Sequence, residues 1–189
     1  IMKWVEYLEK IDHNLLLILN GNNEPFIDQM MWIVSHKLFG VPFYLFFVYL
    51  VYKTKGLLPT IFIVILTAIA VGITDYTAQN LIKENIQRFR PSHHLVLKDQ
   101  LNFVFDYRGG QFGFVSNHAA NMASLALLIF LYVRDKYRHM WLLFLVFVLL
   151  ISYSRIYLGV HYPSDIVGGW IWGSSIAAIF YYLSNKTLT

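Results

Sequence analysis

The sequence predicts an all-α fold, a polytopic membrane helix bundle of five to six hydrophobic helices in one domain that covers residues 1–189. Composition is the first reason, because 57% of the residues are hydrophobic and only 14% are charged, against about 25% charged residues in soluble domains. The second reason is that several apolar segments approach the ~20 residues with which a helix crosses a bilayer. The third is that no linker, repeat or low-complexity segment divides the chain.

The N-terminal part of the chain predicts one helix on the membrane surface and one span. Segment Met2–Leu19 mixes apolar with charged residues, which is typical of an amphipathic interfacial helix, and a sixth span is the alternative. Segment Phe26–Tyr52 is more apolar, but Ser35–Lys37 and Gly40–Pro42 interrupt it. We therefore expect an interfacial approach, followed by a span that runs from about Leu38 to Tyr52.

The remaining apolar segments predict four more spans. Leu57–Ile82, Phe114–Val133 and Ile166–Leu183 each come close to a full bilayer crossing. Met140–Tyr153 is too short by itself, but a helix that continues to Leu158 is long enough. Together these elements make five spans and one interfacial helix.

The basic residues predict which end of the bundle faces the cytoplasm, because short loops rich in Lys and Arg stay on that side. One set of connections carries Lys53, Lys55, Arg134, Lys136 and Arg138, with Lys186 in the tail. The opposite set contains Lys83–Gly113 and Arg155–Ser164, whose own cations we assign to phosphate. We therefore expect a multi-pass membrane protein, with this second set on the outer face of the membrane.

Three short polar islands, Lys83–Pro91, Ser116–His118 and Ser154–Asp165, belong to that second face. Their two histidines, one carboxylate and three cations can bind and transfer a phosphoryl group without a metal ion or another cofactor. The net charge of +4 is scattered over short connections, which suits anionic headgroups better than nucleic acid. The expected partners are therefore a lipid phosphate as substrate and the membrane lipids around it.

In the first island, Lys83 and Arg90 are seven residues apart, so a continuous helix would place them on one face. Pro91 ends such a helix at Arg90, because the residue before proline avoids the helical region. Two cations at the membrane boundary can bind two phosphate oxygens, and two snorkelling flank residues are the simpler alternative. Asp75 and Gln79 extend a polar stripe from Lys83, either for packing or to support that lysine.

The second island begins a hydrophobic helix after a glycine-rich stretch. Ser116 or Asn117 at this place is an ordinary N-cap residue. A helix N-terminus also offers free N–H groups and a positive dipole end to an anion. His118, in the first turn, could then give a proton to a leaving oxygen.

The third island holds His161 and Asp165 four residues apart, with Pro163 at the first helical position. At this spacing the two side chains can meet on one helix face. A carboxylate bonded to one imidazole nitrogen leaves the other nitrogen free to attack phosphorus. A helix-start aspartate beside a surface histidine is the alternative. Arg155 at the end of its span favours a site, because an uncompensated charge near lipid is costly.

The three islands together resemble the three-part signature of the type 2 phosphatidic acid phosphatase family, in the motifs Lys83-x6-Arg90-Pro91, Ser116-Asn117-His118 and Ser154-Arg155-x5-His161-x3-Asp165. That family includes lipid phosphate, undecaprenyl pyrophosphate and lipid A phosphatases, and it shares its site with vanadium haloperoxidases. The second motif departs from the family's Pro-Ser-Gly-His, because this chain has Val115 and Asn117 in place of proline and glycine. The short chain looks like the bacterial members of the family.

The resemblance implies a role for each matching residue. His161 would be the nucleophile that forms a phosphohistidine, Asp165 would orient it, and His118 would protonate the leaving group and then activate water. The non-bridging phosphate oxygens would be held by Lys83, Arg90, Ser116, Asn117 and Arg155. The resemblance implies no metal ion and no other cofactor.

The expected function is hydrolysis of a lipid phosphomonoester or pyrophosphate headgroup. Undecaprenyl pyrophosphate, lipid A, phosphatidylglycerol phosphate and phosphatidate are the candidate substrates. A lipid phosphotransferase would use the same phosphohistidine with a second lipid as the acceptor. A lipid-phosphate carrier without turnover is the alternative outside the enzymes, and the lack of inverted repeats disfavours it.

Overall fold

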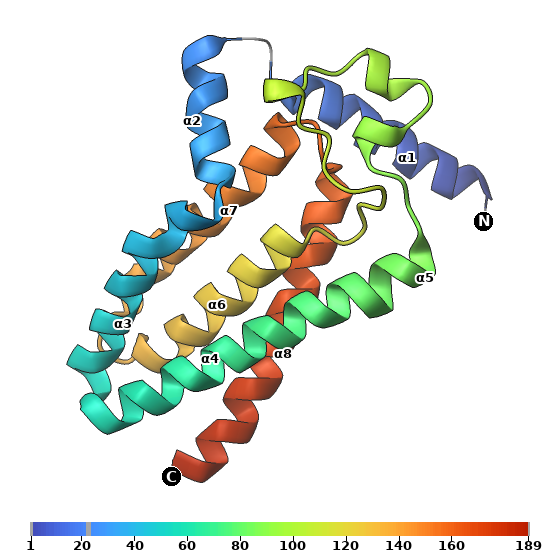
Figure 1. The fold of residues 1–189 in the computed structure, drawn as a ribbon. Helices are drawn as coiled ribbons and strands as arrows, with labels where there is room; N and C mark the ends of the chain where they lie inside the picture. The colour runs from blue at the N-terminus through green and yellow to red at the C-terminus, as the bar shows by residue number, and fades with distance from the viewer. Residues whose placement is uncertain (1, 22–23, 189) are drawn as a thin grey trace.

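The computed structural model describes residues 2–21 and 24–188, and these residues form a bundle of helices (Figure 1). The α-helices are α1 (Met2–Leu19), α2 (Pro25–Ser35), α3 (Val41–Lys55), α4 (Leu57–Thr77), α5 (Glu84–Ile86), α6 (Asn117–Val133), α7 (Trp141–Tyr157) and α8 (Pro163–Leu188). A π-helical segment, Ala78–Lys83, joins α4 to α5 without a break. In the described residues the β-type pairing is limited to one isolated bridge, between Phe89 and Phe112. The predicted all-α fold is confirmed.

Three helices of the described chain are long and apolar enough to cross a membrane, and the bent pair α2–α3 would make a fourth. The three are Leu57–Ile86, Arg138–Tyr157 and Pro163–Asn185. In Leu57–Ile86, the most apolar stretch of 18 residues has a mean hydropathy of 2.5, and only 28% of this stretch is buried inside the protein. Most of its apolar surface is therefore left for lipid. The predicted span Phe114–Val133 corresponds to α6, which has 17 residues and is short for a membrane crossing. The total of five spans therefore stays a prediction.

The interruption predicted in residues 35–42 is a bend of 71° between Pro25–Ser35 and Lys37–Lys55. A 3-10 turn, Lys37–Gly40, leads into α3, which therefore begins at Val41 and not at Leu38. The helix ends at Gly56, whose φ of 81° lies in the left-handed region that favours glycine. Ser35, the last residue of α2, lies directly before this bend.

α6 lies in the middle of the bundle and packs most extensively against α8 (Figure 1). Two glycines of α8, four residues apart, allow this close approach. A Cβ atom on Gly169 would lie 2.7 Å from the carbonyl oxygen of Ser116, and one on Gly173 would lie 2.0 Å from that of Ala120. Small residues at this spacing let membrane helices bring their backbones together. The start of α6 is thereby held beside the start of α8.

Aromatic side chains fill the space between α3, α6 and α7. The rings of Phe47 and Phe144 are stacked with their centroids 4.5 Å apart, and the rings of Phe43 and Phe147 are equally close. Ring pairs at such distances add to the burial of apolar area that stabilises a core. They fix α3 against α7, and α7 carries Arg155.

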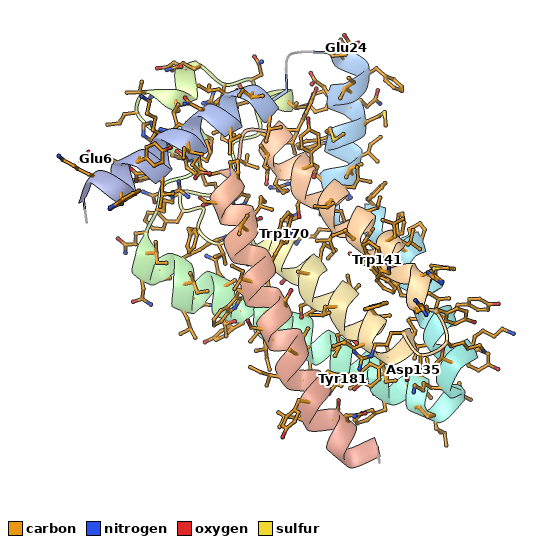
Figure 2. All side chains as sticks on the ribbon, turned by 180° about the vertical axis from the view of Figure 1, so that it is seen from behind. Glu6, Glu24, Asp135, Trp141, Trp170 and Tyr181 are labelled. Carbon is orange, nitrogen blue, oxygen red and sulfur yellow. The ribbon has the colours of Figure 1, made fainter. Side chains whose placement is uncertain are left out.

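The two predicted sets of connections lie at opposite ends of the bundle. The Lys136 ammonium donates a hydrogen bond to the carbonyl oxygen of Lys53 at 2.7 Å, which joins the two basic connections. Figure 2 places Asp135 at this end, away from Glu6 and Glu24. α1 crosses the other end, next to the segment that leads from α5 to α6 (Figure 1).

Candidate active site

The polar end of the bundle contains a cavity of about 500 Å³ between α2, α4, α6 and α7. Its lining includes one or more side chains from each of the three islands. These are Lys83, Arg90, Asn117, His118, Arg155 and His161. Asp75 of α4 and Gln79 of the π-helical segment, which form the polar stripe predicted to extend from Lys83, line it as well. The fold therefore brings together island residues that are up to 78 positions apart, from Lys83 to His161.

Lys83 and Arg90 reach the cavity by different routes, and the predicted helix to Arg90 is wrong. The helix ends at Ile86, because Gln87 has φ 50° and ψ 33° and turns the chain out of the helical path. Lys83, in the π-helical segment, is buried inside the bundle. Arg90 enters from the loop, where its backbone N–H donates to the carbonyl oxygen of Gln111 at 3.0 Å.

Two carbonyl oxygens and two glycines hold the Arg90 side chain in place. Its Nε–H donates to the carbonyl oxygen of Phe112 at 3.1 Å, and Nη1 donates to that of Val160 at 3.3 Å. A Cβ atom on Gly109 would lie 2.8 Å from Arg90 Nη1, and one on Gly113 would lie 3.2 Å from Arg90 Cγ. Burial, together with the nearby positive charge of Arg155, lowers the pKa of Arg90 to about 10. The site therefore concentrates positive charge in a poorly solvated place.

Arg155, at the end of α7, is also buried and is held by side chains that the sequence did not indicate. Nη1 donates to the hydroxyl of Ser35 at the end of α2, and Nη2 contacts the Tyr107 hydroxyl at 3.4 Å. Its Nε–H is buried and has no acceptor among the described residues. Buried donors of this kind are normally satisfied, so Arg155 retains a donor for an anion.

The three cations of the islands are buried charges. Lys83, Arg90 and Arg155 are each at most 9% exposed, and none of them forms an ion pair within the described part of the chain. Buried charges are ordinarily paired, because desolvation without a partner is costly. Three such cations around one cavity have the charge that can bind a multiply charged anion.

The residues of the second island have different roles: one caps α6 and the other two line the cavity. Ser116 caps α6, with its hydroxyl oxygen 3.5 Å from the backbone N–H of Ala119, and it is fully buried outside the cavity lining. Asn117 lines the cavity and donates from Nδ2 to the Asp75 carboxylate at 2.8 Å. His118 lines the same cavity one residue further along the helix. The helix start predicted here is confirmed, while the phosphate contact of Ser116 stays a prediction.

His161 and Asp165 are in contact, but not on one helix face. α8 begins at Pro163, as expected, so His161 lies in the turn before it and Asp165 in the first helical turn. His161 Nδ1 is 3.2 Å from Asp165 Oδ2, which also accepts the backbone N–H of Tyr162 at 3.0 Å. Burial, followed by the charges of Arg90 and Arg155, holds the pKa of His161 well below its usual range. The imidazole is therefore neutral at pH 7, with Nε2 free for chemistry.

Sequence reasoning missed several polar residues that support these groups. Ser35 and Tyr107 contact Arg155, Asn121 donates to Asp75 at 2.8 Å, and Arg88 pairs with Asp165 at 2.8 Å. No periodicity or motif identifies them, because each becomes a neighbour only when distant segments meet. In the described residues, no group of three His, Cys, Asp or Glu side chains is placed to hold a metal ion.

The arrangement can support transfer of a phosphoryl group to a histidine. A neutral, oriented imidazole lies at the same cavity as three buried cations and a second histidine. Cations that are fixed in advance stabilise charge that develops in a transition state. The second histidine can donate or accept a proton.

Comparisons with known proteins agree on one family. A model of the PAP2 superfamily matches residues 56–188. A lipid A 4'-phosphatase of Porphyromonas gingivalis is 36% identical over 188 residues, which cover 97% of this chain and 79% of that protein. A lipid A 4'-phosphatase of Bacteroides thetaiotaomicron is 33% identical over 183 residues, with 96% and 80% covered. The crystal structure of a transmembrane PAP2-type phosphatidylglycerolphosphate phosphatase from Bacillus subtilis has a similar fold, with a TM-score of 0.68 at 18% identity over 95% of this chain and 87% of that one.

Proposed function

This chain belongs to the PAP2 superfamily, and we propose that it is an integral membrane phosphatase that removes phosphate from a lipid headgroup through a phosphohistidine at His161. One observation carries the proposal. Three buried cations that have no ion-pair partner in the described part of the chain surround a cavity into which a neutral, carboxylate-oriented histidine opens. This combination suits a bound phosphate, whose charge the cations neutralise while the histidine attacks.

In the first step, the lone pair of His161 Nε2 attacks phosphorus and the bond from phosphorus to the lipid oxygen breaks. His118 gives its proton to that oxygen, so that the lipid leaves as an alcohol or as a shorter phosphate. Lys83, Arg90 and Arg155 hold the non-bridging oxygens in the five-coordinate transition state. Asp165 balances the positive charge that develops on the His161 ring.

In the second step, water attacks the phosphorus of the phosphohistidine. His118, now neutral, takes a proton from that water, the bond between phosphorus and nitrogen breaks, and inorganic phosphate leaves. The enzyme returns to its starting protonation state. Each histidine therefore acts in both steps, one as nucleophile and leaving group and the other as acid and base.

The relatives suggest lipid A carrying a 4'-phosphate as the first substrate to test. Two lipid A 4'-phosphatases are at least 33% identical to this chain over nearly all of its length. Undecaprenyl pyrophosphate is the second, because an undecaprenyl-diphosphatase of Sulfolobus acidocaldarius is 32% identical over 75 residues, which cover 40% of this chain and 35% of that protein. In both cases the lipid would enter from the bilayer while its phosphate occupies the cavity.

The cavity would face the periplasm of a bacterial inner membrane. The support for this orientation is the basic end of the bundle, which contains Lys53, Lys136 and Arg138 and lies away from the cavity. Basic short connections favour the cytoplasmic side.

Phosphate release by the purified protein in detergent tests the function, with lipid A, undecaprenyl pyrophosphate, phosphatidylglycerol phosphate and phosphatidate as substrates. We expect release from at least one lipid with a chelator present, and none from His161→Ala. Full activity of His161→Ala would contradict the mechanism. Transfer of phosphate to a second lipid in place of release would identify a phosphotransferase.

A further inference from the structure

Arg88 is a half-buried cation beside the active site, with 22% of its side chain exposed. Its side chain is absent from the lining of the cavity and instead lines a separate groove of about 260 Å³ next to α1. Nη1 donates to Asp165 Oδ1 at 2.8 Å and to the Ser164 hydroxyl at 2.6 Å. Arg88 therefore reaches the catalytic carboxylate from the side opposite to His161, which contacts Oδ2.

The Asp165 carboxylate depends on this contact for its charge. It is fully buried, and Arg88 is its one ion-pair partner among the described residues other than neutral His161. A buried carboxylate left without a cation either takes up a proton or moves toward water, since isolated charge is costly to bury. Either change weakens the acceptor that keeps His161 Nδ1 protonated and Nε2 free.

Arg88 is in turn fixed by Asp12, a residue of the N-terminal helix. Arg88 Nη2 donates to Asp12 Oδ2 at 2.7 Å, and Asp12 Oδ1 accepts the backbone N–H of Ser164 at 2.9 Å. Asp12 is 6% exposed, although the sequence places it among the charged residues of a surface helix. It therefore binds α1 to the first turn of α8, which carries Asp165 (Figure 1).

Tyr162, the aromatic neighbour of Arg88, also contacts α1. The guanidinium lies 4.0 Å from the ring centroid of Tyr162, and His13 of α1 stacks on that ring at 5.3 Å. The backbone N–H of Tyr162 is a donor to Asp165 Oδ2. Adjacent residues of α1 thus hold both groups that contact the carboxylate, the Arg88 guanidinium and the Tyr162 backbone.

We infer that Arg88 is a positioning residue for the reaction, which acts through Asp165 on His161, and that Asp12 of α1 holds Arg88 for this task. The inference rests on the proposed function of the His161 site. It assigns α1 a role in catalysis besides its expected place at the membrane surface. Arg88 and Arg90, two residues apart, then have separate tasks, one behind the nucleophile and one at the phosphate.

Steady-state kinetics of Arg88→Gln, Arg88→Lys and Asp12→Asn test the inference, with Arg108→Gln as the matched control. Arg108 lies in the same connection, is 46% exposed and pairs with Asp106 at 3.3 Å away from the cavity. We expect Arg88→Gln to lower kcat on the order of 10–100-fold, by analogy with the loss of partners that orient metal-binding histidines. KM and the inhibition constant of inorganic phosphate should not change, because Arg88 does not line the cavity.

Arg88→Lys should recover part of kcat, because an ammonium can neutralise Asp165 but lacks the second guanidinium nitrogen through which Arg88 also binds Asp12. Asp12→Asn should lower kcat less than Arg88→Gln, and Arg108→Gln should match the wild type. Weaker inhibition by phosphate in Arg88→Gln, or an unchanged kcat, would overturn the inference.

A measurement without turnover separates this inference from the proposed function. In ¹⁵N spectra of histidine-labelled protein, Arg88→Gln should reduce the fraction of His161 that carries its proton on Nδ1, and Arg108→Gln should not. An unchanged tautomer in a folded Arg88→Gln protein refutes the role of Arg88, whatever the substrate is. Failure of the proposed function would be seen instead in an inactive wild type or an active His161→Ala.

Discussion

The Asn117 side-chain amide donates a hydrogen bond to the Asp75 carboxylate at 2.8 Å, and so connects the first residue of α6 to α4 across the cavity. Asn121, one helical turn later, donates to the same oxygen at 2.8 Å. The motif of the family has glycine where this chain has Asn117. The asparagine that replaces glycine therefore has a hydrogen-bond partner: the Asp75 carboxylate in α4, which accepts from both amides.

Replacing Asn117 by aspartate should destabilise the protein more than replacing it by glycine. Asn117→Gly removes one hydrogen bond to a charged group, which contributes about 1.5–3 kcal/mol. Asn117→Asp places a second carboxylate against Asp75 and adds repulsion to that loss. Thermal unfolding in detergent measures the order, and an Asn117→Asp protein as stable as the wild type would contradict the pairing.

A methyl group on Gly113 should disturb the site, whereas one on Gly110 should not. A Cβ atom on Gly113 would lie 2.9 Å from Asp165 Oδ2 and 3.2 Å from Arg90 Cγ, so these side chains must move. Small displacements of catalytic groups can cost about 100-fold in rate, and we expect a loss of kcat approaching that size in Gly113→Ala. Gly110→Ala is the matched control, because no atom lies within 4 Å of its Cβ position. Equal activity of the two variants would show that the glycine is not needed.

The loss of activity in His118→Ala should depend on how much protonation the leaving group of the substrate needs. General acid–base catalysis contributes about 10²–10⁴-fold, so His118→Ala should lose activity in that range on a lipid phosphate. With p-nitrophenyl phosphate, whose leaving group needs little protonation, the first step should persist while hydrolysis of the phosphohistidine stalls. A burst of p-nitrophenol equal to the enzyme concentration measures this outcome. Equal losses on both substrates without a burst would assign His118 a different role.

His161 should remain neutral as the pH falls from 7 to 6. Burial and then the charges of Arg90 and Arg155 hold the pKa of His161 well below its usual value, so lowering the pH to 6 does not protonate the nucleophile. Arg90→Gln removes one positive charge and should raise the pKa of His161, which moves protonation to higher pH. ¹⁵N chemical shifts of the imidazole measure both. A protonated His161 at pH 6 in the wild type would contradict the electrostatic account.

The proposed orientation can be measured with single cysteines, since the sequence contains none. Gln100 lies exposed in the connection on the cavity side, and Asp135 lies exposed at the basic end (Figure 2). A maleimide that does not cross membranes should label Gln100→Cys in intact spheroplasts and Asp135→Cys only after permeabilisation. The reverse pattern would place the cavity on the cytoplasmic side.

Composition and the spacing of polar islands were sufficient to predict the membrane class, the all-α fold and the helix starts at Ser116 and Pro163. These features are local, because an N-cap serine or a proline at the first helical position acts on its own turn. The length of an apolar segment is also a local property, because the thickness of the bilayer sets how many residues a span needs. The sequence also supplied every residue of the three islands that we assign to chemistry.

Only the tertiary structure decided how those residues are used. The left-handed Gln87, and not Pro91, ends the helix after Lys83, so that Arg90 enters the cavity from a loop. Ser35 and Arg88 became partners of the active-site residues through contacts across 120 and 77 positions of sequence. Such contacts depend on helix packing, where a glycine pair lets α8 approach α6, and no local pattern encodes them. The sequence determined which groups are available for the reaction, and packing determined which of them line the cavity and which hold others in place.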